Sequence, residues 1–179
     1  MRIAIATPLY PPDTAPAALY AKELAERLSN SHTVSLVVYG HLPEPIEGVH
    51  IVSIKKRLPL PLRLLAYTSS LLTETRRTDV LYVINGASVE LPLLLVSRLS
   101  RTPFIFIAAD ADAFARADNS RALRFLQRKA MRRSSAFIET LPMPRPEILP
   151  LEARPVEALA TYERSWQEHL ALLTTTYGK

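Results

Sequence analysis

Two aspartates follow an apolar segment whose pattern predicts a buried strand. Asp110 and Asp112 stand two residues apart in AADADAFARAD, directly after PFIFIA. Two carboxylates in this arrangement could act as a catalytic base, accept hydrogen bonds from sugar hydroxyls or bind a metal ion. The alternative is that both are solvated loop acids, one of which caps the next helix. The spacing leaves both interpretations open, so these residues are weak candidates for catalysis and no catalytic residue is assigned.

A second candidate site lies in INGASVE, after another apolar segment. Asn85 and Gly86 favour a tight turn. The Ser88 hydroxyl and the N–H groups at the start of the next helix could hold an anion or part of a substrate. A helix cap without a ligand is the alternative interpretation.

The first loop, PLYPPDTAPAA (residues 8–18), contains no glycine. It follows the first predicted strand, where a dinucleotide-binding fold keeps a glycine-rich phosphate loop. A dinucleotide site is therefore disfavoured. One interpretation is a rigid loop that lines a substrate cleft, with Tyr10 and Asp13 facing it. The other is a proline-stiffened connection that only shapes the turn.

Basic residues gather in two segments of a chain with a net charge of +5. A basic face beside leucines is typical of proteins that bind an anionic membrane surface, and an ordinary solvated face is the alternative. Nucleic acid is not expected as a partner, because no recognition motif appears. The candidate anion-binding residues are Lys55, Lys56, Arg57 and Arg63 around LPLPLRLLAY, and Arg124 and Arg128 on a later basic helix.

Several chemistries are disfavoured by what the sequence lacks. There is no cysteine, so there are no disulfides, thiolate metal sites or cysteine nucleophiles. The four histidines show no metal-ligand spacing and no G-x-S-x-G motif occurs, so no metal site and no serine hydrolase are predicted. We find neither a signal peptide nor an apolar run long enough to span a bilayer. We expect a cytoplasmic location, with peripheral attachment to a membrane as an option.

These candidate residues must be positioned by an α/β fold. Near-continuous apolar strands alternate with helical patterns, which predicts a doubly wound, mostly parallel, Rossmann-like sheet with helices on both faces. Candidate ligand residues then meet at the carboxyl ends of the strands. The predicted strands are residues 2–7, 33–39, 48–54, 79–84, 103–108 and 135–139.

The pattern divides the chain into three parts. Residues 1–140 form the predicted sheet domain, and residues 141–155 form a proline-rich linker. Residues 156–179 form one amphipathic helix that is expected to dock back on the domain. Its predicted apolar face consists of Leu159, Tyr162, Trp166, Leu170 and Leu173.

The order of these segments resembles GT-B glycosyltransferases of family 4. MRIAIATPLYPPDTAPAALYAKELAERLSNSHTVSLVVYG is similar to the family's opening strand, its P-x-x-P-P turn, and its L-A-x-x-L helix. TDVLYVING, TPFIFIAADAD and SSAFIE are similar to later strands of the family's N-terminal domain. YERSWQEHLALLTTTY resembles the family's last helix, which crosses back onto that domain. The resemblance covers nearly the whole chain.

This resemblance implies sugar transfer from a nucleotide-sugar donor to a lipid-linked or saccharide acceptor that this half binds. It implies no metal and no bound cofactor. The chain departs from the family where Ala15–Pro16 replaces a Gly-Gly pair and where Ala109 replaces a histidine. The family's donor-binding domain is missing from these residues. Glu139 and Glu147 copy the spacing of a family donor-site element without its surrounding sequence.

We therefore expect a domain that is not competent for transfer alone and works with a donor-domain protein or another subunit. One alternative is a catalytically inactive relative that acts as a binding or regulatory subunit. A second alternative is a peripheral membrane-binding module. The loss of the Gly-Gly pair and of the histidine favours the first alternative, and the basic, leucine-rich segments favour the second.

Overall fold

Six apolar segments form one parallel sheet, so the predicted α/β fold is confirmed. The computed structural model describes residues 1–40, 42–144 and 158–177. The strand order is β3-β2-β1-β4-β5-β6, and each neighbouring pair is parallel. The strands are β1 (Arg2–Ala6), β2 (Thr33–Tyr39), β3 (Val49–Ile54), β4 (Val80–Ile84), β5 (Phe104–Ile107) and β6 (Ala136–Ile138).

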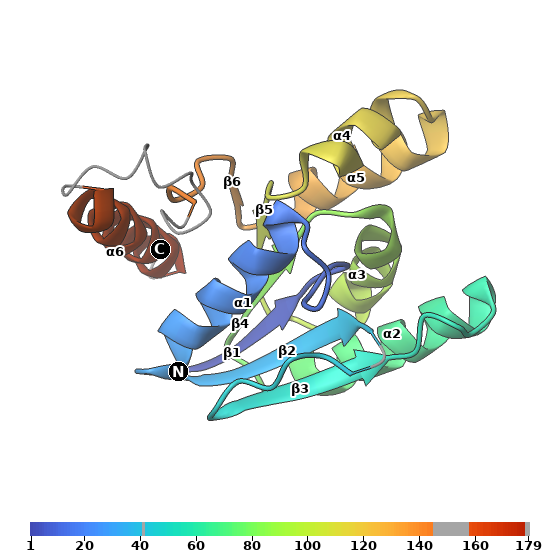
Figure 1. Ribbon diagram of the computed structural model, residues 1–179. Coiled ribbons are helices and arrows are strands. Elements are labelled where there is room, and N and C mark those ends of the chain that lie inside the picture. Colours follow the sequence, from blue (N-terminus) through green and yellow to red (C-terminus); the bar gives the residue numbers. More distant parts are fainter. Residues whose placement is uncertain (41, 145–157, 178–179) are drawn as a thin grey trace.

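Helices cover both faces of this sheet (Figure 1). On one face lie α1 (Pro16–Ser29) and α6 (Ala158–Tyr177), and on the other lie α2 (Leu60–Thr75), α3 (Ala87–Leu99) and α5 (Arg121–Arg133). A short helix, α4 (Ala111–Asp118), precedes α5. No helix in the described ranges is both long and apolar enough to cross a bilayer.

The alternation of side chains along β1 explains why the sheet has two hydrophobic cores. Ile3 and Ile5 belong to the core under α1 and α6, whereas Ala4 and Ala6 belong to the core under α2, α3 and α5. Successive side chains of a strand point to opposite faces. Both faces of β1 are therefore apolar, as a central parallel strand requires.

The last helix packs on the α1 face through an aromatic contact. Trp166 is 2% exposed and its ring stacks on Tyr20, with the centroids 5.6 Å apart. The Tyr20 hydroxyl lies 2.7 Å from Nε2 of the buried His169. Arg27 forms two 2.8 Å hydrogen bonds with the Glu163 carboxylate. These contacts hold α6 against α1.

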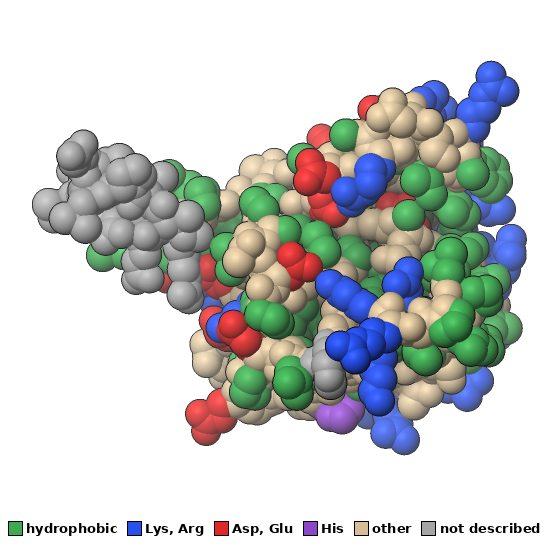
Figure 2. All heavy atoms as spheres, turned by 45° about the vertical axis from the view of Figure 1, so that its right-hand side comes forward, with side chains coloured by type: hydrophobic (Ala, Val, Ile, Leu, Met, Phe, Trp, Pro, Cys, Tyr) green, Lys and Arg blue, Asp and Glu red, His purple; other side chains and the backbone are tan. Residues whose placement is uncertain are grey.

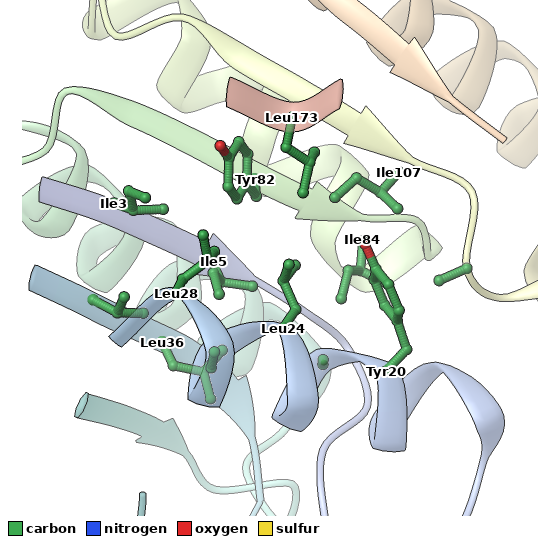
Figure 3. Packing of buried hydrophobic residues seen from close by; sticks show 14 of the residues in the cluster. Ile3, Ile5, Tyr20, Leu24, Leu28, Leu36, Tyr82, Ile84, Ile107 and Leu173 are labelled. Carbon is green, nitrogen blue, oxygen red and sulfur yellow. The ribbon is translucent and has the colours of Figure 1, made fainter. Parts of the chain in front are cut away.

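The buried face of α6 differs in part from the predicted one. Tyr162, Trp166 and Leu173 are buried, and Figure 3 shows Leu173 against Tyr82 and Ile107 of the sheet. Leu159 was expected on this face, but it is 61% exposed. It lies in the first turn of the helix. Residues 141–144 form neither helix nor strand, and the rest of the predicted linker, Glu147 included, lies outside the described residues.

The strand order creates a point where neighbouring connections leave in opposite directions. From β1 the chain continues to β2 on one side, and β4 pairs with β1 on the other. In open parallel sheets, ligands bind at such a switch point, outside the carboxyl ends of the strands. The loops after β1, β4 and β5 therefore frame the candidate site.

Candidate functional site

A cleft of about 490 Å³ opens at the carboxyl ends of β1, β4 and β5, and we call it the switch-point cleft. Its volume lies within the range of small-molecule sites. The apolar lining includes Leu9, Leu60, Leu64, Leu91, Leu123 and Leu126. The polar and charged lining consists of Lys56, Arg63, Ser88, Asp110 and Arg116. Five predicted site residues thus line one cavity: Lys56, Arg63, Gly86, Ser88 and Asp110.

Gly86 and Pro8 meet in the lining of this cleft. Gly86 has a φ of 153°, and a Cβ atom added there would lie 2.6 Å from Cγ of Pro8. Any larger residue would clash with the proline ring, so the close approach of two loops requires glycine here. Gly86 directly precedes α3, whose first residue is Ala87. Its N–H donates to Oε1 of Glu90 at 3.2 Å.

Asn85 joins the ends of β4 and β5. Its side-chain amide nitrogen donates to the carbonyl of Asp110 at 2.7 Å, and its Oδ1 accepts from the N–H of Asp110 at 2.7 Å. The side chain is fully buried. It does not line the cleft, and both of its polar atoms are engaged. Asn85 therefore positions the loop after β5 instead of contacting a ligand.

Asp110 caps α4, so the helix-cap part of the second interpretation holds, but its side chain is buried instead of solvated. Its Oδ1 accepts from the N–H of Ala113 at 3.1 Å, and its Oδ2 lies 3.1 Å from a nitrogen of Arg116. Asp112 is exposed in the first turn of α4 and does not line the cleft. The two carboxylates therefore do not act as a pair on one ligand. The described residues hold no group of three or more His, Asp or Glu that could bind a metal ion.

The first loop places its two candidates differently. One of the two interpretations had Tyr10 facing the cleft, but its ring is buried in the core on the α1 side. Its hydroxyl donates to the carbonyl of Glu44 at 2.9 Å, and burial raises the pKa of this hydroxyl above its usual value. Asp13 lies 3.3 Å from Nζ of Lys56, a cation of the cleft lining. Asp13 thus contacts the cleft through its ion pair.

Cations outnumber acids in the lining. Arg63 donates to the carbonyl of Lys56 at 3.2 Å and its guanidinium lies over the ring of Tyr39, 5.7 Å from the centroid. Within the described ranges, Arg63 has no carboxylate partner, and its Nε is buried without a hydrogen-bond partner. Arg116 adds a third cation, which is paired with Asp110. The cleft can therefore attract an anionic group through Arg63 above all.

The sequence alone did not single out Glu90 or Arg116. Glu90 is 2% exposed in the first turn of α3, and burial raises the pKa of its carboxyl to about 7. The negative charge of Asp110 raises this pKa further, and the N–H of Gly86 lowers it. The available signals were an acid four residues after Gly86 and an arginine six residues after Asp110. Neither pattern predicts burial or pairing.

The other predicted basic residues lie outside the cleft. Lys55 and Arg57 are exposed on the connection between β3 and α2. Figure 2, in which the right-hand side of Figure 1 comes forward, shows Lys and Arg side chains close to hydrophobic ones on this face. Arg124 and Arg128 line a separate groove on the outer side of α5, with Arg121, Phe125, Lys129 and Arg132. The structure thus divides the basic residues between two surfaces.

A second pocket of about 460 Å³ lies between α1, residues 141–144 and α6, and we call it the α1 pocket. Its lining is largely apolar and includes Pro16, Trp166 and Ala109. Pro16 and Ala109 are the positions at which the resemblance leads one to expect glycine and histidine. Both departures therefore fall at the α1 pocket and not at the switch-point cleft.

Two solved structures align with this chain. Anabaena Alr3699/HepE, solved in complex with UDP and glucose, aligns with a TM-score of 0.56 and 14% identity over 76% of this chain. The C-terminal domain of the coenzyme A biosynthesis bifunctional protein CoaBC aligns with a TM-score of 0.43 and 14% identity over 69% of each chain. The alignment with Alr3699/HepE covers only 37% of that protein's chain. No protein-family model and no curated protein matches the sequence. At these identities the likeness to Alr3699/HepE shows a shared fold.

Proposed function

We propose that this chain is the acceptor-side domain of a sugar-transfer system. It binds a lipid-linked or saccharide acceptor in the switch-point cleft, while a donor-binding partner supplies the nucleotide sugar. The observation that carries the proposal is the composition of the cleft, which combines a leucine-rich wall with cations at a topological switch point. Such a cavity suits an amphiphile with an anionic group.

The position of the cations supports an acceptor that carries a phosphate. Arg63 presents a guanidinium without a carboxylate partner in the described part of the chain, and the N-terminal end of α3 at Ala87 lines the same cleft. Arginine binds phosphate with two parallel hydrogen bonds, and a helix N-terminus favours negative charge. The leucines of α2 and α5 would contact the apolar part of the same molecule.

The likeness to Alr3699/HepE supports the sugar-transfer part of the proposal. UDP and glucose, which that crystal contains, are the two halves of a nucleotide sugar. The alignment with this chain covers 37% of that chain, so a complete enzyme of that kind would need a further domain. A one-sided cleft cannot exclude water or stabilise a departing nucleotide diphosphate. A donor-binding partner is therefore part of the proposal.

Binding of farnesyl phosphate, measured by isothermal titration calorimetry, tests the acceptor site. We expect it to bind more tightly than either inorganic phosphate or farnesol, because the cleft would use both the cation and the leucines. Arg63→Gln should weaken binding about tenfold or more, since it removes a charged hydrogen bond. Arg128→Gln, on the outer side of α5, is the matched control and should leave binding unchanged. Equal loss in both variants, or no binding by the wild type, would overturn the acceptor site.

A second function is favoured by the α1 pocket. Pro16 and Ala109 stand where the resemblance leads one to expect glycine and histidine, which suits an inactive relative that acts as a binding or regulatory subunit. Isolation of the protein at its native expression level, followed by mass spectrometry of the proteins bound to it, distinguishes the two proposed functions. A bound donor-binding protein supports sugar transfer, whereas an unrelated active enzyme supports the regulatory function.

A further inference from the structure

The first turns of α2 carry three leucines that the fold leaves in solvent. Leu60, Leu62 and Leu65 are 56%, 55% and 66% exposed. Deeper in the same helix, Tyr67 and Leu71 are fully buried in the core on this face of the sheet. The core therefore explains the apolar side chains of the later turns but not these three leucines.

Cations stand next to these leucines. Lys55 and Arg57 are exposed just before α2, and neither forms an ion pair within residues 1–40, 42–144 and 158–177. We call Lys55, Arg57, Leu60, Leu62 and Leu65 the α2 tip. Single exposed leucines are ordinary on protein surfaces, but three within the first six residues of one helix, beside unpaired cations, are not.

We propose that the α2 tip is a docking surface for an anionic lipid bilayer. Its cations complement the negative surface of such a membrane, and its leucines can enter the boundary between headgroups and acyl chains. Nucleic acid would satisfy the cations but would leave the leucines in water. A bilayer is the occupant that accounts for both kinds of side chain.

The α2 tip lies at the mouth of the switch-point cleft. Leu60 belongs to both surfaces, and Lys56 of the cleft lining stands between Lys55 and Arg57. A chain docked through the tip would therefore hold its cleft at the membrane surface. Only the identity of the molecule that enters the cleft rests on the proposed function, because docking itself needs no sugar transfer.

Co-sedimentation of the full chain with vesicles tests the docking surface. The probes are phosphatidylglycerol–phosphatidylcholine vesicles and pure phosphatidylcholine vesicles at low salt, without any lipid-linked saccharide. We expect binding to the anionic vesicles only. Lys55→Gln with Arg57→Gln should weaken it about 30-fold, because each basic residue near such a surface contributes about a factor of five. Leu60→Ser, Leu62→Ser and Leu65→Ser together should weaken it about tenfold or more.

The matched control is Leu159→Ser with Leu172→Ser, which changes two exposed leucines of α6 on the opposite face of the sheet. This variant should sediment like the wild type. Three results would overturn the proposal: no sedimentation of the wild type with anionic vesicles, full binding by the leucine variant, or preferential binding to RNA that is insensitive to the leucines. Failure of farnesyl phosphate binding would not produce any of these, so the two proposals fail separately.

Discussion

The buried carboxyl of Glu90 should make the chain less stable at alkaline pH. Burial raises the pKa of Glu90 from its usual 4.5 to about 7 in the folded state. The folded chain therefore binds more protons than the unfolded chain between these two values. Stability from the protonated Glu90 is fully present below pH 4.5 and is lost as pH rises through 7. The difference of about 2.5 units corresponds to about 3 kcal/mol at pH 8 and above.

Glu90→Gln removes this loss, because glutamine cannot ionise. Its side-chain oxygen can still accept the hydrogen bond from the N–H of Gly86. We therefore expect the variant to be about 3 kcal/mol more stable than the wild type at pH 8. The two should be nearly equal at pH 4.5, where Glu90 is protonated.

Urea unfolding followed by far-ultraviolet circular dichroism at pH 4.5–8.5 measures this difference. Asp112→Asn is the control, because it removes an acid from the first turn of α4 where the side chain is exposed. Its effect on stability should be small, because the side chain is exposed. The reasoning is refuted if Glu90→Gln is no more stable than the wild type at pH 8. It is also refuted if the gain in stability is the same at both ends of the pH range.

Two further predictions concern the packing of α6 and the lining of the cleft. Burial lowers the pKa of His169, so the stability that comes from packing its neutral ring is present above about pH 6.5 and is lost as pH falls. The fluorescence emission of Trp166, the single tryptophan, should therefore shift to the red at pH 5. His169→Gln should abolish that shift. Gly86→Ala should lower the free energy of unfolding by about 3 kcal/mol, because its Cβ would meet Pro8. Gly48→Ala, at a φ of 75° in open space, should cost only about 1 kcal/mol in the same urea titration.

The sheet could be predicted because its strands are short apolar runs bounded by turn residues. Burial on both faces leaves no polar alternation, and this pattern is read directly from a segment such as β4. The helix α4 was not predicted. It has only eight residues, and its stability depends on the cap and ion pair of Asp110. The segment around Asp110 and Asp112 was therefore interpreted as a loop.

The place of the candidate cleft could be predicted, but the details of its lining could not. The rule that ligands bind at the carboxyl ends of parallel strands led to Gly86, Ser88 and Asp110, which do line one cleft. The direction of a loop side chain is not set by that rule, and Tyr10 turns into the core on the α1 side. The burial of Glu90 likewise depends on packing around α3 that no local pattern reveals.

The contact between Pro8 and Gly86 decides how this fold can bind an anion. A glycine at the end of β4 would let backbone approach a phosphate, but here its free side is filled by the ring of Pro8. Its N–H is also engaged, because it donates to Glu90. The first loop offers no glycine in its place. An anion in the switch-point cleft must therefore be held mainly by side chains, and Arg63 is the cation of its lining that lacks a carboxylate partner among the described residues. This arrangement supports the proposed phosphate-bearing acceptor over a dinucleotide, and it makes Arg63→Gln the substitution that we expect to weaken anion binding most.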